Sequence, residues 1–111
     1  MRKLICIFLL FIGFSGFSQN DLFFEEANSA YQNGNYQDAV KAYEKILENG
    51  EVSSELYYNL GNAHYKLNNV APSIYYFEKA LQLDPTDEDI KNNIMFARNM
   101  AIDDIETIEQ T

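Results

Sequence analysis

The chain repeats itself at an offset of 34 residues, and this period constrains the fold more than any other feature. Shifting Leu22–Ser53 by this offset lays it on Leu56–Asp87 with aromatic, small and charged residues in register. A period in this range is typical of a stack of helical hairpins, each burying its apolar face on a neighbour. The matched pairs are Leu22 with Leu56, Phe23 with Tyr57, Phe24 with Tyr58, Asn28 with Asn62, Tyr31 with Tyr65, Tyr43 with Phe77, Glu44-Lys45 with Glu78-Lys79, and Leu47 with Leu81.

Apolar periodicity and turn residues place five helices in an all-α fold. Asn69 is the expected cap of the fourth helix, and Thr86 that of the fifth. The fifth helix carries an apolar stripe and no second helix follows it, so it is expected to cap the stack. The stripe is Ile90, Ile94, Ala97 and Ala101. The predicted ranges are 21–33, 36–48, 54–67, 70–83 and 87–102, which form repeats at about 20–53 and 54–87 and the capping helix, within a domain over 19–102.

The second repeat resembles a tetratricopeptide repeat (TPR). Gly61 is expected to let the two helices of its hairpin approach, Ala80 to let the next hairpin dock, and Pro85 to stop the helix. The first copy departs from the family pattern at Ile46 and Glu51. The second departs at Asn68 and Pro72-Ser73. The resemblance rests on Tyr57–Ala63, Tyr65-Lys66, Ile74, Tyr76-Phe77, Lys79–Leu81 and Leu83–Pro85. It implies a short α-solenoid of two hairpins plus a capping helix.

Residues 1–18 are predicted to be a secretory signal peptide. Arg2-Lys3 precedes the apolar run Leu4–Phe14, which is too short for a comfortable membrane span of about 20 residues. We expect cleavage after Ser18, within a residue or two, and a periplasmic or otherwise exported protein, with an uncleaved membrane anchor as the alternative. The single cysteine, Cys6, would leave with this peptide, so no disulfide is expected.

The net charge of the chain restricts the classes of molecule that it can bind. Loss of Arg2 and Lys3 leaves six basic against seventeen acidic residues, a net charge of about −11. Such a surface disfavours nucleic acid and anionic lipid. The acids gather at Asp84–Asp89 and in residues 103–111, which we predict to be an acidic tail. These acidic residues form either an ordinary solvent-exposed face or a surface that attracts a basic partner.

In a stack of this kind the first helices of the hairpins line a concave groove, where a protein or an extended peptide is expected to bind. Asparagine amides can both donate and accept hydrogen bonds, and tyrosines offer a flat apolar surface with a polar tip. Lys66 is the groove's one clear cation, and Asp21, Glu55 and Asp89 lie along its rim. The groove should therefore disfavour an acidic peptide and differ from the Lys- and Arg-rich TPRs that grip carboxylate termini. The predicted groove residues are Phe24, Asn28, Tyr31, Tyr58, Asn59, Asn62, Tyr65, Lys66, Asn92, Asn93 and Phe96.

No catalytic constellation is visible. His64 is the only histidine and lacks a nucleophile and an orienting partner, so we expect it to pack between helices. The sequence has no zinc-ligand spacing and no phosphate-binding or dinucleotide motif. We predict no enzyme activity, no metal, no cofactor and no small-molecule substrate.

A narrower resemblance covers nearly the whole chain. The signal peptide, the TPR block, Asp87–Ile90, Ala97-Arg98 and Asp104–Glu106 resemble the N-terminal part of the BatE family, the TPR proteins of bacterial aerotolerance operons. That resemblance implies an envelope scaffold working beside von Willebrand A-domain membrane proteins. Members usually continue into a membrane segment and an SH3-like β-domain, whereas this sequence stops at Thr111.

Three functional hypotheses remain at this point. The first is an exported adaptor that binds a protein through its groove. The second is a truncated or self-associating TPR fragment, whose fifth helix completes a homodimer or a larger solenoid. The third, with least support, is an accessory that regulates an enzyme.

Overall fold

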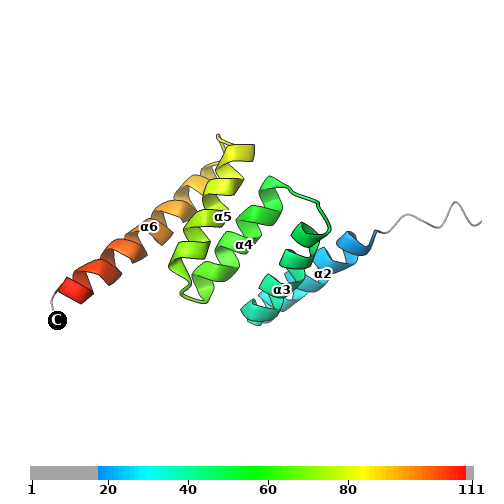
Figure 1. The fold of residues 1–111 in the computed structure, drawn as a ribbon, viewed down its shortest axis with the longest axis horizontal. Coiled ribbons are helices and arrows are strands. Elements are labelled where there is room, and N and C mark those ends of the chain that lie inside the picture. Colours follow the sequence, from blue (N-terminus) through cyan, green and yellow to red (C-terminus); the bar gives the residue numbers. More distant parts are fainter. Residues whose placement is uncertain (1–17, 110–111) are drawn as a thin grey trace, which may run out of the picture.

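The computed structural model describes residues 18–109, and over that range it consists of five α-helices without strands. Consecutive helices pack on one another, so that α2–α3 and α4–α5 are two hairpins and α6 continues the stack (Figure 1). The predicted all-α solenoid of two hairpins plus a capping helix is confirmed. The helices are α2 (Gln19–Gln32), α3 (Tyr36–Glu48), α4 (Ser54–Lys66), α5 (Val70–Leu83) and α6 (Glu88–Glu109).

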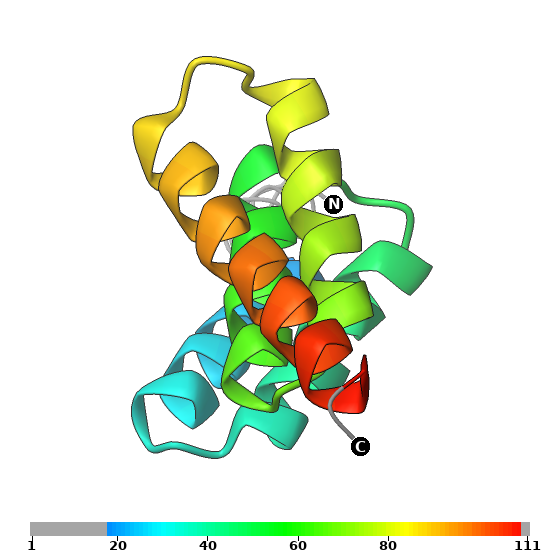
Figure 2. The ribbon, with the colours of Figure 1, turned by 90° about the vertical axis from the view of Figure 1, so that its left-hand side faces the viewer.

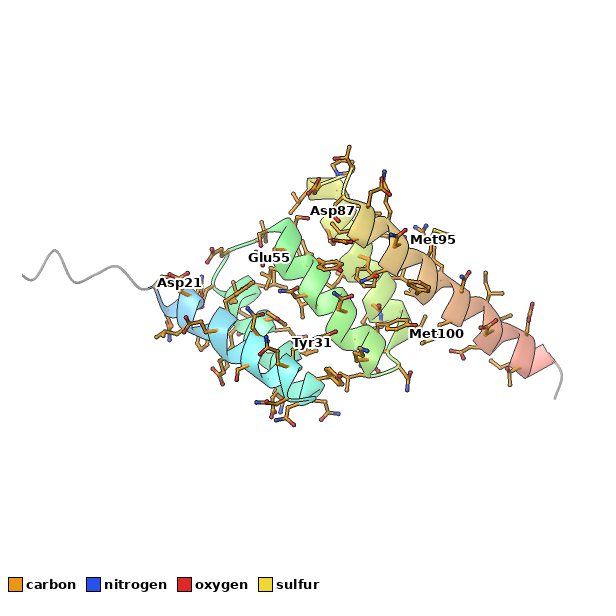
Figure 3. The ribbon with its side chains drawn as sticks, turned by 180° about the vertical axis from the view of Figure 1, so that it is seen from behind. Asp21, Tyr31, Glu55, Asp87, Met95 and Met100 are labelled. Atoms are coloured by element: carbon orange, nitrogen blue, oxygen red, sulfur yellow. The ribbon has the colours of Figure 1, made fainter. Side chains whose placement is uncertain are left out.

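The helices alternate between two faces of the stack. Seen from the C-terminal end, α6 lies across the front with α5 beside it (Figure 2). The opposite view to Figure 1 brings α2, α4 and α6 to the front (Figure 3). The first helices of the hairpins and the capping helix therefore share one face, as the repeat predicts.

Close approach of α4 and α5 depends on the absence of a side chain at Gly61. A Cβ atom there would lie 2.5 Å from the Phe77 ring, well inside van der Waals contact. Buried Ser73 on α5 donates a hydrogen bond of 2.8 Å to the Gly61 carbonyl oxygen. The role predicted for Gly61 is confirmed.

The capping helix closes the second hairpin. Ile90, Ile94 and Ala97 are buried together with Phe77 and Ala80 of α5. Ala80 has no exposed surface, which agrees with the predicted docking role of this small residue.

One predicted helix cap is wrong, and the other is right in position but makes no side-chain cap bond. The side chain that caps α6 is Asp87, whose Oδ1 accepts a hydrogen bond of 3.0 Å from the Ile90 amide, and not Thr86. Asn69 stands at the N-cap position of α5 but makes no side-chain cap bond. Its amide nitrogen instead contacts Nδ1 of His64 at 3.2 Å. A nearby ring nitrogen offers a direct partner and competes with the local cap.

The acidic segment predicted as a tail is helical. α6 continues through residues 103–109 instead of ending near 102. Acidic residues do not break a helix, and neither Gly nor Pro interrupts this stretch. The Thr107 hydroxyl also donates to the Asp103 carbonyl oxygen at 2.9 Å, within the helix.

The predicted signal segment lies outside the described residues, except Ser18. Ser18 caps α2: its hydroxyl accepts from the Asp21 amide, and its own amide donates to the Asp21 carboxylate, both at 3.2 Å. This reciprocal pair is a capping box. Among the described residues, none of the helices has the length and apolarity needed to cross a membrane.

Candidate functional site

Four connected hollows mark the face shared by α2, α4 and α6, and we call them together the groove. Two are lined by aromatic and amide side chains near the middle of the helices. The other two lie at the helix N-terminal ends and are rich in carboxylates. Figure 3 shows this polarity, with Asp21, Glu55 and Asp87 at the upper ends of the three helices and Tyr31 toward the lower end of α2.

The aromatic hollow lies mainly between α4 and α6 and has a volume of about 330 Å³. Phe96 forms part of its wall although 58% of this residue is exposed. The Tyr58 ring packs against buried Phe77 at 6.0 Å between centroids, so the floor of the hollow is fixed by the core. The lining residues are Tyr31, Tyr58, Asn62, Tyr65, Lys66, Phe77, Asn93 and Phe96.

A hydrogen-bonded link joins α6 to α4 in this hollow. The Asn93 amide nitrogen donates to the Tyr58 hydroxyl at 3.0 Å and to the Asn62 Oδ1 atom at 2.8 Å. Both bonds are partly buried. This link uses the Oδ1 atom of Asn62. The amide nitrogen of Asn62 donates to no protein group within the described residues, so that nitrogen is available to a bound peptide.

The amide hollow, of about 170 Å³, lies between α2 and α4. The Tyr43 hydroxyl donates a short hydrogen bond to the Asn28 Oδ1 atom. Burial raises the pKa of the Tyr43 phenol to about 12, so this donor stays protonated at physiological pH. The lining residues are Asn28, Tyr31, Gln32, Tyr43, Asn59 and Asn62.

Carboxylates dominate the two acidic hollows, and neither hollow is lined by a basic residue. The first acidic hollow, between α2 and α4, also contains Phe24. The second acidic hollow lies between α4 and α6. The acidic lining residues are Asp21, Glu51 and Glu55 in the first, and Glu55, Asp84, Asp87 and Asp89 in the second.

Almost all of the predicted groove residues line these hollows. The exception is Asn92, which is exposed on α6 and lines none of the four, whereas its neighbour Asn93 lines the aromatic hollow. Residues that line the hollows but were not predicted to do so include Asn20, Gln32, Tyr43 and Phe77. Tyr43 and Phe77 are equivalent in the period, and both lie on the second helices of their hairpins, which were not expected to line the groove.

His64 packs against Tyr76 of α5, with ring centroids 5.5 Å apart and planes at 11°. Burial lowers its pKa below the usual value, and the charge of Glu44 opposes this shift. The histidine is therefore neutral and part of the helix packing. Among residues 18–109, no three His, Cys, Asp or Glu side chains gather as a metal-holding group.

The helix pairing, the offset of 34 residues and the groove on the first helices define a helical-repeat interaction scaffold. Residues 24–88, more than half of the chain, match the tetratricopeptide repeat family, and the protein belongs to it. TPR domains typically bind protein partners, and proteins of this family are generally scaffolds without enzyme activity. A search of the curated proteins gave no match.

Proposed function

We propose that this protein is an exported adaptor of the cell envelope, which holds an extended segment of another protein in the groove. The aromatic hollow carries this proposal. Phe96 is exposed there beside Tyr58 and Tyr65, and rings of this kind are enriched where proteins bind one another. The amide groups of Asn59 and Asn62 lie alongside and suit the backbone of an extended peptide.

Site-specific photo-crosslinking in cells tests this function, with matched positions on α6. Phe96 and Met95 are adjacent and equally exposed, each at 58%, but only Phe96 lines the aromatic hollow. A photo-reactive residue at Phe96 should capture a discrete envelope protein, and the same residue at Met95 should not. Equal capture from both positions, or no capture from Phe96, would rule out the groove as the binding site.

Export is part of the proposal, and the residues of the N-terminal segment support it. Leu4–Phe14 has the length and flanks of a signal peptide. Since Ser18 completes the capping box of α2, cleavage before Ser18 would preserve the cap, and cleavage after it would remove the cap. Intact-mass measurement of the protein from the periplasmic fraction decides between these products. A full-length mass in the membrane fraction would instead indicate an uncleaved anchor.

Within the envelope, we propose that the adaptor works in a BatE-like aerotolerance system beside von Willebrand A-domain membrane proteins. The support is the sequence resemblance in and after the repeats. Recovery of an A-domain protein among the Phe96 adducts would support this assignment. Adducts that contain only proteins of other kinds would reject it while leaving the adaptor function intact.

A second candidate function is self-association through α6, as a structural fragment or a homodimer. The specific observation is that Ile102 and Ile105 are 52% and 58% exposed on the part of α6 beyond its buried stripe. Exposed apolar side chains on one helix are a common dimer surface. Light scattering should then give twice the monomer mass, and Ile102→Glu with Ile105→Glu should return the monomer. A monomeric wild-type chain would exclude this alternative.

A further inference from the structure

We propose that the groove selects one chemical class of partner segment: an extended peptide with Lys or Arg side chains at one end and an aromatic or branched aliphatic anchor about three residues away. This inference rests on the proposed adaptor function and adds the chemistry and direction of the occupant. It is carried by the continuity of the hollows, by the charge at one end, and by the spacing between that end and the aromatic hollow.

The hollows form one track because neighbouring hollows share residues. Glu55 lines both acidic hollows. Tyr58, one helical turn further along α4, lines the second acidic hollow and the aromatic hollow. Tyr31 and Asn62 line both the aromatic and the amide hollow. A single extended segment can therefore contact the acidic end and the aromatic hollow at once.

The carboxylates at the acidic end differ in whether they already accept hydrogen bonds within the protein. Asp21 and Asp87 accept hydrogen bonds at helix caps, and Glu51 accepts one of 2.7 Å from the Asn20 amide. Glu55 and Asp89, by contrast, form no ion pair among the described residues. Both lie in the first turn of a helix, where the macrodipole stabilises the negative charge without a counterion. These two carboxylates are therefore available to a cation from outside.

The charge at the other end gives the occupant a direction. Lys66 is the one basic residue that lines any of the four hollows, and it lies at the C-terminal end of α4. A basic side chain is attracted by Glu55 and Asp89 and repelled by Lys66. A segment with its basic residues over the N-terminal ends of α4 and α6 is thus favoured over the reverse placement.

The spacing of the two ends sets the spacing within the peptide. Glu55 and Asn62 are seven residues apart on one helix, which corresponds to about 10 Å along its axis. An extended chain covers that distance in about three residues. Asp89 and Phe96 are likewise seven residues apart on α6, so the anchor would enter beside Phe96 while the basic side chains reach the acidic end.

Selection from a displayed library of random 12-residue peptides by the full chain tests this inference. Selected peptides should carry Lys or Arg about three residues from an aromatic or aliphatic residue. Enrichment of acidic or uncharged peptides that still lose binding in Phe96→Ala would overturn the basic-partner inference and leave the adaptor function standing. Failure to select any peptide that depends on Phe96 would overturn both.

Variants in which carboxylates are replaced by amides then show which acidic residues attract the basic peptide. Binding is measured by fluorescence anisotropy, with a synthetic copy of a selected peptide as the probe. Glu55→Gln with Asp89→Asn should weaken binding about fivefold, as expected for two solvent-exposed ion pairs. Asp38→Asn with Glu48→Gln makes the same change in net charge on exposed residues of α3, outside the groove, and should leave affinity within about twofold. Equal loss in the two double variants would mean that only net charge matters and would overturn the proposed site.

Discussion

The two hairpins place the hydroxyl of an aromatic pair on opposite helices. In the first hairpin Phe24 of α2 packs against Tyr43 of α3, with ring centroids 5.8 Å apart. In the second, the equivalent pair is Tyr58 of α4 and Phe77 of α5, at 6.0 Å. The ring packing is thus conserved between repeats, while the polar group has moved from the second helix to the first.

This exchange decides which partner each groove asparagine has. Asn28 accepts from Tyr43 within its own hairpin. Its equivalent in the next repeat, Asn62, faces a phenylalanine that cannot donate, and its oxygen accepts from Asn93 of α6 instead. Tyr58 accepts from the same Asn93 side chain. In the first hairpin Asn28 is therefore paired within the hairpin, whereas in the second Asn62 and Tyr58 hold the capping helix.

The largest expected effect concerns the small residue of the second hairpin. Gly61→Ala would force a Cβ atom to within 2.5 Å of the Phe77 ring, whereas Ala27 occupies the equivalent place in the first hairpin as a fully buried alanine. Overpacking should outweigh the gain in helix propensity and lower the free energy of unfolding by about 2 kcal/mol. Urea denaturation followed by circular dichroism measures this.

A double-mutant cycle assigns that effect to the ring. Phe77→Leu removes part of the ring, so Gly61→Ala should cost less in its presence, with a coupling of about 1 kcal/mol or more. A stabilising effect of Gly61→Ala in the wild-type background would show that the two helices can separate at no cost.

The second prediction removes the internal bond of the first hairpin. Tyr43→Phe removes the hydroxyl from the Phe24–Tyr43 pair. The Asn28 Oδ1 atom, which is partly buried, then loses its hydrogen-bond donor. Unfolding free energy should fall by about 1.5 kcal/mol. Tyr75→Phe is the control, because Tyr75 is 53% exposed, and it should change stability by less than about 0.5 kcal/mol. Similar losses in both variants would contradict a specific role for the Tyr43 hydroxyl.

The third prediction addresses the link to the capping helix. Asn93→Ala removes the hydrogen bonds to Tyr58 and Asn62. The free energy needed to open α6 locally should then fall by about 1 kcal/mol, which corresponds to amide exchange about fivefold faster. Hydrogen exchange resolved by mass spectrometry should show this change in α6 and little change in α2 and α3. The adjacent, exposed Asn92 supplies the control: Asn92→Ala should leave exchange as in the wild type.

The smallest effect is a pH dependence confined to the second hairpin, since His64 corresponds to Ala30 in the first. The His64 pKa is lowered in the folded state by burial, so the unfolded chain takes up a proton first as the pH falls through about 6.5. The unfolded state then binds more protons than the native state, and stability decreases toward acid pH. Urea midpoints measured from pH 7.5 to 5.5 should fall in the wild type and fall less in His64→Gln. Parallel curves would exclude His64 as the cause.

Much of this structure followed from the period, and the errors have identifiable causes. The bounds of α3 and α5 were predicted correctly, because turn residues such as Gly34 and Asn68 with positive φ separate the helices of each hairpin. The cap of α6 was missed although the offset contains it: Ser53, which caps α4, lies 34 residues before Asp87. Aspartate is also a better N-cap residue than threonine, so residue preference and the repeat both favour Asp87.

The groove was predictable to the level of a helix face but not to that of hydrogen bonds. Periodicity alone puts Asn92 and Asn93 one position apart, at an angle of about 100° around α6. Only Asn93 turns toward Tyr58, a choice made by the packing of α6 on α5. The carboxylates of the acidic end are far apart in the sequence. They gather at one end of the groove face because α2, α4 and α6 run in the same direction (Figure 3).

The packing of each helix on its neighbours in sequence also governs how the chain folds. Consecutive helices form the principal contacts, and the longest step among the closely packed pairs joins α4 to α6. Such short sequence separations make loop closure inexpensive in entropy and place folding in the microsecond-to-millisecond range typical of helical proteins. The stack can therefore grow by the addition of each helix to the one before it, and the core of the first hairpin is completed when α4 packs on it.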